Sequence, residues 1–146
     1  MTSAPPTSGY SGTPLPQKLG LKDGQRVLFI SLPAELKELR KARNFVEIAE
    51  AGWDTFTDGD PGYDVIHGFT ASRAVLEKSA KKLMKQIDRD GSIWISWPKK
   101  ASKVQTDITE DVIREVILPI GLVDVKVAAV SEIWSGLKLM IRKELR

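Results

Sequence analysis

Residues 26–33 read Arg-Val-Leu-Phe-Ile-Ser-Leu-Pro, an apolar row that ends at a proline. The turn signal Asp23-Gly24 stands just before the row. A continuous apolar run of this length is typical of a strand that is buried on both faces, as in a parallel sheet. The stretch therefore predicts a buried strand at 26–32. Pro33 suits the first position of a helix, and we expect a short exposed helix at 34–43.

Apolar runs between turn signals predict further strands at 45–51, 63–69, 92–97, 122–130 and 137–142. A long helix is predicted from the N-cap Ser72 to about residue 88, where Asp90-Gly91 ends it. Asp107 or Thr109 caps the next helix, which Pro119 and Gly121 terminate. Two tryptophans, Trp94 and Trp97, fall on opposite or oblique faces of the strand at 92–97, and Trp134 falls in the turn between the last two strands.

Helix-sized segments separate most of these strands, and this alternation predicts a mostly parallel sheet covered on both faces. The last two strands have only a short connection, which suits an antiparallel pair. We therefore expect an α/β three-layer sandwich. Residues 1–16 contain four prolines and are predicted to be a flexible tail, with a single domain at 17–146. Leu15, Leu19 and Leu21 could still anchor a short helical turn on that domain.

Composition excludes several kinds of site. The chain has no cysteine and one histidine, His67, so thiolate metal sites, disulfides and sites with two imidazoles are excluded. No apolar run approaches the roughly 20 residues that span a bilayer. The net charge of +3 is too small to indicate nucleic acid by itself. We expect a cytoplasmic, soluble protein without a metal.

Ligands of open α/β sheets bind outside the carboxyl ends of the strands, where the strand order reverses. Lys99 and Lys100 could hold a phosphate or carboxylate there, or could simply be solvated loop lysines. Trp97 or Trp134 could stack on a ligand, or could only pack. By this rule the candidate ligand-binding residues are Ser31, Thr70, Ser72, Trp97, Lys99, Lys100, Ser102 and Trp134.

Three other patterns have a plain structural interpretation beside the functional one. A basic stripe at helical spacing could bind a phosphate backbone or form a solvated helix face. It consists of Lys78, Lys81, Lys82, Lys85 and Arg89. A cluster of four aspartates could suggest a calcium loop, but it lacks the spacing of such a loop and is typical of a turn. It consists of Asp54, Asp58, Asp60 and Asp64. His67 lies in an apolar strand, where it could be catalytic if a partner lay nearby or could be a packed or hydrogen-bonded structural histidine, which is the interpretation we favour.

Several motifs carry a resemblance to known proteins. They are GYSGTPL at 9–15, KLG at 18–20, WPKK at 97–100, TED at 109–111 and WSGL at 134–137. Together they resemble small bacterial proteins grouped as a domain of unknown function. The order of elements resembles a shortened class I S-adenosylmethionine methyltransferase, which implies a Rossmann-like fold.

Methyltransferases of that class have a glycine-rich turn after the first strand, through which the backbone approaches the cofactor. Here the turn reads Ser31-Leu32-Pro33-Ala34-Glu35, without glycine, and Glu50 is only a candidate for the acidic residue after the second strand. We therefore predict no cofactor and a non-catalytic, methyltransferase-like domain that binds a protein partner or a small anionic ligand. The alternatives are a small enzyme that holds an anionic metabolite on Lys99 or Lys100, and a weak nucleic-acid binder that uses the lysine stripe.

Overall fold

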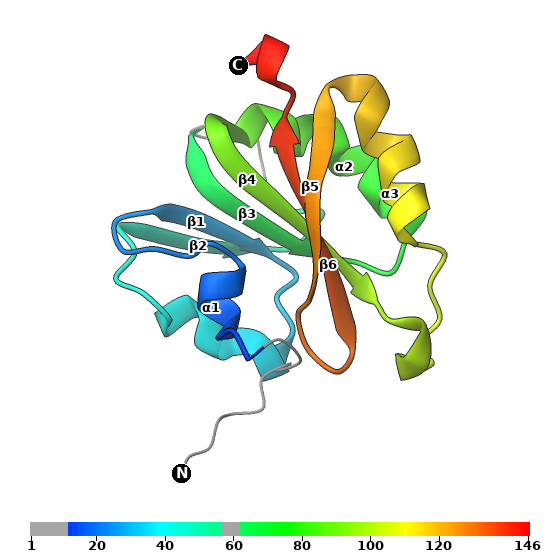
Figure 1. The fold of residues 1–146 in the computed structure, drawn as a ribbon, viewed down its shortest axis with the longest axis horizontal. Coiled ribbons are helices and arrows are strands. Elements are labelled where there is room, and N and C mark those ends of the chain that lie inside the picture. The colour runs from blue at the N-terminus through cyan, green and yellow to red at the C-terminus, as the bar shows by residue number, and fades with distance from the viewer. Residues whose placement is uncertain (1–11, 57–61) are drawn as a thin grey trace.

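A computed structural model describes residues 12–56 and 62–146, which hold a sheet in the order β2-β1-β3-β4-β6-β5 (Figure 1). The strands are β1 (Arg26–Ile30), β2 (Glu47–Ala51), β3 (Tyr63–Phe69), β4 (Ile87–Pro98), β5 (Leu122–Ala129) and β6 (Trp134–Ile141). β2, β1, β3 and β4 are parallel, while β6 is antiparallel to both β4 and β5. This arrangement confirms the predicted Rossmann-like α/β sandwich with its antiparallel C-terminal pair.

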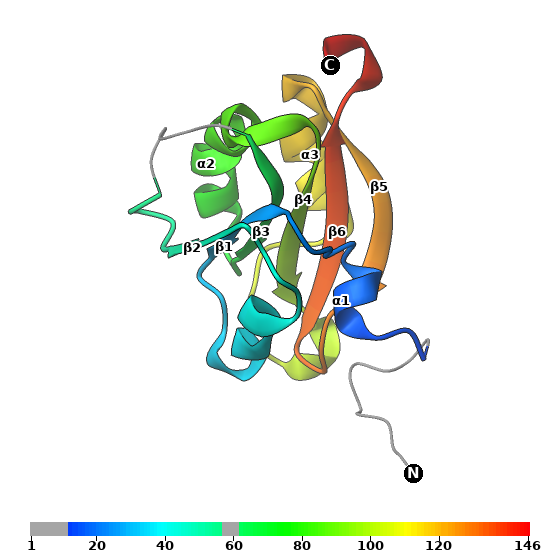
Figure 2. The same cartoon turned by 90° about the vertical axis from the view of Figure 1, so that its left-hand side faces the viewer.

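Helices cover both faces of the sheet (Figure 2). They are α1 (Leu15–Lys18), α2 (Arg73–Gln86) and α3 (Glu110–Ile117), with short 3-10 segments η1 (Ala34–Lys41), η2 (Lys100–Ser102), η3 (Leu118–Ile120) and η4 (Lys143–Leu145). The helix predicted at 34–43 is thus a 3-10 segment. Pro33 has extended backbone angles and precedes η1 as its cap, so it is not the first helical residue. Among the described residues no helix is both long and apolar enough to cross a membrane.

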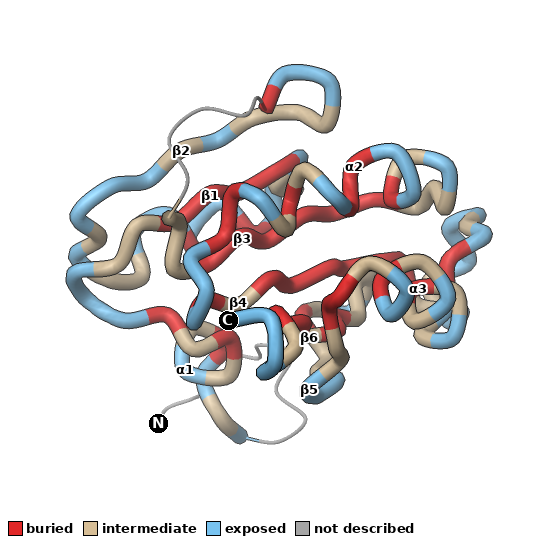
Figure 3. The backbone as a smooth tube through the Cα atoms, turned by 90° about the horizontal axis from the view of Figure 1, so that it is seen from above, coloured by how far each residue is buried: buried red, intermediate tan, exposed pale blue. Residues whose placement is uncertain are grey.

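Each face of the sheet has its own apolar core, because side chains alternate between the faces along a strand. Ile66 and Trp97 belong to the core under α2 and α3, whereas Phe69 and Trp94 belong to the core under α1 and η1. The two tryptophans of β4 thus lie on opposite faces, as predicted. Figure 3 shows that the most buried backbone lies in β1, β3 and β4, at the centre of the sheet.

The segment around α1 is docked on the sheet. Leu15, Leu19 and Leu21 are buried, as expected of apolar anchors. Trp94 Nε1 donates a hydrogen bond to the Leu19 carbonyl at 3.0 Å, and Lys18 Nζ donates to the Ala129 carbonyl at 3.2 Å. The segment from Leu15 onward is therefore packed on the sheet, and the first eleven residues of the predicted tail lie outside the described part of the chain.

Two predicted boundaries were wrong. β4 begins at Ile87, not at residue 92, because the chain around Asp90-Gly91 continues in a strand whose pairing with β3 shifts register. Gly91 permits this close approach: a Cβ there would lie 2.9 Å from the carbonyl oxygens of Tyr63 and Asp64. Trp134 is the first residue of β6, opposite Pro98, and not part of a turn.

The structure decides between the two predicted caps of α3. Thr109 caps this helix, because its side chain accepts a hydrogen bond from Val112 N at 3.2 Å. Asp107, the other predicted cap, binds the first residue of α2 instead.

Candidate functional site

A hollow of about 790 Å³ lies beside the carboxyl end of β4, next to the start of α3. Its volume is within the range of clefts that hold small ligands. The apolar part of its wall consists of Trp97, Pro98, Val104 and Ile108, and the polar part consists of Lys100, Lys103, Gln105, Thr106, Thr109, Glu110, Asp111 and Arg114. The hollow thus combines an apolar wall with charged groups at the edge where α/β sheets bind ligands.

The cations of this hollow fall into two kinds. Arg114 forms ion pairs with Glu110, Asp111 and Asp124 at 2.8 to 3.0 Å, and its hydrogen bond to Asp124 holds the pKa of that carboxyl below its usual range. Within the described residues, the ammonium groups of Lys100 and Lys103 have no ion-pair or hydrogen-bond partner. These two lysines are therefore the cations available to an anionic ligand.

Hydrogen bonds fix the loop that carries these lysines. The Ser102 hydroxyl donates to the Lys99 carbonyl at 2.6 Å and accepts from Val104 N at 3.2 Å. Thr106 Oγ1 donates to the Ala71 carbonyl at 2.8 Å. Lys103 ends η2 in the left-handed region, with φ 62°, which is uncommon for a residue with a side chain. The wall of the hollow is thus a defined loop that is tied to the segment before α2.

Only part of the predicted set meets in this hollow. Trp97 and Lys100 line it. Ser102 and the backbone of Lys99 hold the loop behind it. Ser72 caps α2 by accepting from Val75 N.

The side chains of the remaining predicted residues are already hydrogen-bonded within the protein, or lie away from the hollow. Thr70 Oγ1 accepts from Ser72 N at 3.1 Å. Trp134 packs edge-on against Phe69, with ring centroids 5.3 Å apart, in the core of the opposite face. Ser31 is exposed at the end of β1, with φ 56°.

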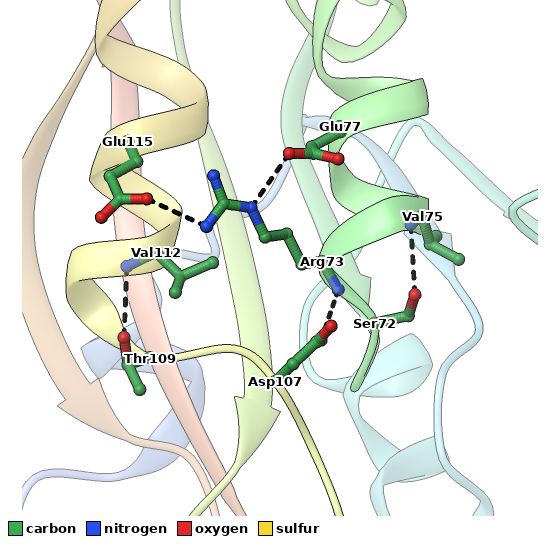
Figure 4. A network of polar contacts seen from close by, with 8 residues as sticks. All are labelled: Ser72, Arg73, Val75, Glu77, Asp107, Thr109, Val112 and Glu115. Atoms are coloured by element: carbon green, nitrogen blue, oxygen red, sulfur yellow. Dashed lines mark hydrogen bonds and ion pairs between the residues drawn. The ribbon is translucent and has the colours of Figure 1, made fainter.

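A polar network joins α2, α3 and the loop between them (Figure 4). Asp107 Oδ1 accepts from Arg73 N at 2.7 Å. The Arg73 guanidinium forms ion pairs with Glu77 and Glu115, both at 2.9 Å. The hydrogen bonds to Glu77 and then Glu115 raise the pKa of Arg73. This network holds α3, and with it one wall of the hollow, beside α2.

Trp53 lies across the carboxyl edge of the sheet. It follows β2, yet its Nε1 donates to the Phe69 carbonyl at the end of β3, at 2.7 Å. A Cβ added to Gly68 would lie 2.5 Å from the indole ring, so the ring packs directly on the β3 backbone. Because β1 lies between β2 and β3, this contact crosses the end of β1. Strand order reverses at this point, since β1 is followed by β2 on one side and β3 on the other.

His67 has a structural environment, as predicted for a packed histidine. It is buried and its Nε2 lies 2.7 Å from Ser96 Oγ. Its ring stacks on Phe69 with centroids 4.2 Å apart. Burial lowers the pKa of His67 to about 3. The imidazole is therefore neutral at physiological pH, and the His67–Ser96 pair is closed off from solvent.

The basic stripe is shorter than predicted, because α2 ends at Gln86 and Arg89 lies in β4. Lys82 is engaged elsewhere: its Nζ donates to the Phe56 carbonyl at 3.2 Å and lies 4.7 Å from the centre of the Phe56 ring. Two residues of the aspartate cluster, Asp58 and Asp60, lie outside the described residues, and Asp64 accepts from Arg26 N.

Trp53 and Lys103 were not among the predicted site residues, although both lie at this edge. Trp53 stands in a loop without a motif, and the one hint was a glycine, Gly68, inside an otherwise apolar strand, which suggests a close approach to the backbone. Lys103 follows Lys99 and Lys100 in the sequence, but only the fold shows that it turns toward the hollow.

No protein-family model and no curated protein matches the chain. Solved structures do. A SAM-dependent methyltransferase from Aquifex aeolicus matches with a TM-score of 0.64 and 16% identity, over 86% of each chain. The chain has a methyltransferase-like fold.

Two further structures agree with this methyltransferase-like fold. The cyclopropane synthase MmaA2 from Mycobacterium tuberculosis has a TM-score of 0.61 and 10% identity, covering 86% of this chain and 81% of its own. The N-methyltransferase NodS from Bradyrhizobium japonicum has a TM-score of 0.60 and 12% identity, covering 83% and 88%. At these identities the likeness concerns the fold alone.

Proposed function

We propose that this methyltransferase-like domain is a non-catalytic binding module, which takes a small anionic ligand in the hollow beside Trp97 and does not transfer methyl groups. The observation that carries the proposal is the position of Trp53. Its indole lies on Gly68 and donates to the Phe69 carbonyl, across the edge where sheets of this kind bind their ligands.

The residues at this edge do not fit S-adenosylmethionine. A nucleoside that approached the ends of β1 and β3 would compete for space with the Trp53 ring and for the Phe69 carbonyl that the indole already occupies. The turn after β1 has a serine in the left-handed region in place of a glycine, and Pro33 then leads into η1.

The choice of an anion rests on charge. Lys100 and Lys103 reach the hollow without a partner among the described residues, while the two acids in its wall, Glu110 and Asp111, are paired with Arg114. The lining itself holds three cations and two acids, and the two lysines are the cations in it that no acid among the described residues occupies. Trp97, Pro98 and Val104 offer an apolar surface beside these cations, so the ligand we propose has an apolar part as well as an anionic group.

Calorimetry with S-adenosylmethionine and thermal unfolding with small organic anions test the two halves separately. We expect no cofactor binding at micromolar concentration, and a rise in unfolding temperature with an aromatic dicarboxylate such as phthalate. A Lys100→Ala, Lys103→Ala variant should lose that rise, whereas a control variant, Lys37→Ala, Lys41→Ala, should keep it. Low-micromolar binding of S-adenosylmethionine would refute the proposal of a non-catalytic module. If the Lys100→Ala, Lys103→Ala variant kept the full rise in unfolding temperature, the anion would not bind in this hollow.

A further inference from the structure

A second hollow, of about 650 Å³, lies at the opposite end of the sheet from Trp97. β6 is antiparallel to β4, so Ile141, the last residue of β6, lies near the amino end of the parallel strands. α2, η3 and η4 contribute the other walls. The residues that line the hollow are Lys81, Met84, Lys85, Pro119, Ile120, Ile141 and Leu145.

The floor of this hollow is apolar and open to water. Leu145 is 55% exposed, and Pro119 is exposed beside it. A Cβ added to Gly121 would lie 2.6 Å from Leu145 Cδ1 and 2.9 Å from Met84 Cε. The two side chains therefore meet over bare backbone at Gly121.

Hydrogen bonds hold the η4 wall in position. Arg142 N donates to the Gly121 carbonyl at 2.8 Å, and Arg146 Nε donates to the Ile141 carbonyl at 2.7 Å. The apolar surface beside Leu145 is thus built by defined contacts.

The rim of the hollow is cationic. Lys81 and Lys85 stand one helical turn apart on α2, so both can face the same ligand. Lysine stems pack along apolar surfaces while the ammonium groups stay in water. Within the described part of the chain, neither ammonium group has an ion-pair or hydrogen-bond partner. An apolar floor beside a cationic rim suits an amphiphile, a molecule with an apolar chain that ends in an anion.

We propose that this second hollow binds a free single-chain carboxylate, with its chain on Met84, Ile120, Ile141 and Leu145 and its headgroup between Lys81 and Lys85. A concave surface of this volume suits a small ligand. A membrane surface would instead need an apolar patch that projects from the protein. The site is separate from the hollow beside Trp97 and does not rest on the function proposed for it.

Titration with decanoate, below the concentration at which it forms micelles, tests this proposal. Methyl NMR signals of Met84, Ile120, Ile141 and Leu145 should shift together and saturate, and they should do so equally in the Lys100→Ala, Lys103→Ala variant, in which the hollow beside Trp97 has lost its two lysines. A Lys81→Glu, Lys85→Glu variant should bind decanoate about ten-fold more weakly. The matched control, Lys37→Glu, Lys41→Glu, changes two exposed lysines of η1 and should bind as the wild type does.

Two further ligands complete the experiment. Decyltrimethylammonium has the same chain with a cationic head and should bind more weakly than decanoate. The proposal is overturned if these signals do not saturate, if both charge variants bind equally, or if the cationic amphiphile binds as well. Binding to anionic phospholipid vesicles without binding to decanoate would also overturn it, in favour of a membrane surface. Circular dichroism of each variant verifies that the fold is unchanged.

Discussion

Asp107 Oδ1 accepts a hydrogen bond from the backbone N–H of Arg73 at 2.7 Å, although 34 residues separate the two (Figure 4). The first N–H groups of a helix have no partner inside the helix, and an acidic group at this end also stabilises the helix dipole. A loop residue therefore supplies part of the cap of α2, beside Ser72, and fixes the loop that borders the proposed anion site.

Replacing Asp107 by alanine should lower the free energy of unfolding by about 1 kcal/mol, as is typical for the loss of a capping side chain. Asp107→Asn keeps an acceptor oxygen and should lose less. Urea unfolding measures both. Glu38→Ala, at an exposed acid of η1, is the control and should be nearly neutral; a loss for Asp107→Ala no larger than this would contradict the capping role.

A double-mutant cycle tests the contact between Trp53 and Gly68. Gly68→Ala places a methyl group where the indole ring lies, and we expect a loss of about 1 to 3 kcal/mol from overpacking. In a Trp53→Ala background the same change should be nearly neutral, because the ring is gone. Chemical unfolding of the four proteins gives the coupling energy. Equal losses in both backgrounds would show that the ring does not pack on Gly68 in solution.

Stability should depend on pH through His67. Burial lowers its pKa from 6.5 to about 3 in the folded protein, so the unfolded chain binds a proton first as the pH falls. The contribution of His67 is therefore fully present above pH 6.5 and decreases by about 1.4 kcal/mol per unit below it, down to about pH 3.

His67→Gln, which does not titrate, should show a shallower loss between pH 6.5 and 4.5 in unfolding experiments. The low pKa of Asp124 adds a loss in acid that both proteins share. If the two slopes were the same, the imidazole would not be held neutral by burial.

The docking of α1 depends on Trp94. Trp94→Phe removes the donor to the Leu19 carbonyl and leaves a buried acceptor unsatisfied, which costs about 1 to 3 kcal/mol. Amide hydrogen exchange should then become faster in residues 18–21. Trp134→Phe is a suitable control, because its indole N–H has no partner among the described residues; faster exchange in this control as well would contradict a specific role for Trp94.

The sequence predicted those elements whose signals are local. Ser72 caps α2 as expected, and β3 spans Tyr63–Phe69 as its apolar run indicated. Asp90-Gly91 misled the prediction because the same pair of residues marks a turn or a bulged strand, and only the neighbouring β3 decides between them. Asp107 and Thr109 are equal cap candidates in the sequence, yet three-dimensional packing gives each a different helix.

The ligand-binding set could be predicted only in part. The rule that ligands bind at the carboxyl ends of strands pointed to the correct edge for Trp97 and Lys100. It could not show that the hydroxyls of Thr70 and Ser72 already accept hydrogen bonds from backbone N–H groups. The rule also could not predict that Trp53 packs on Gly68 and binds the Phe69 carbonyl, because this contact depends on β1 lying between β2 and β3.

The attachment of α1 has a consequence for how the chain acquires its fold. The Leu19 carbonyl is hydrogen-bonded to Trp94, which is 75 residues away in the sequence. Lys18 is hydrogen-bonded to the Ala129 carbonyl, which is 111 residues away. Contacts between such distant residues form slowly. On the ribosome, α1 therefore emerges long before these two partners exist, so the Trp94 bond can form only after β4, and the Ala129 bond only after β5, has been synthesised.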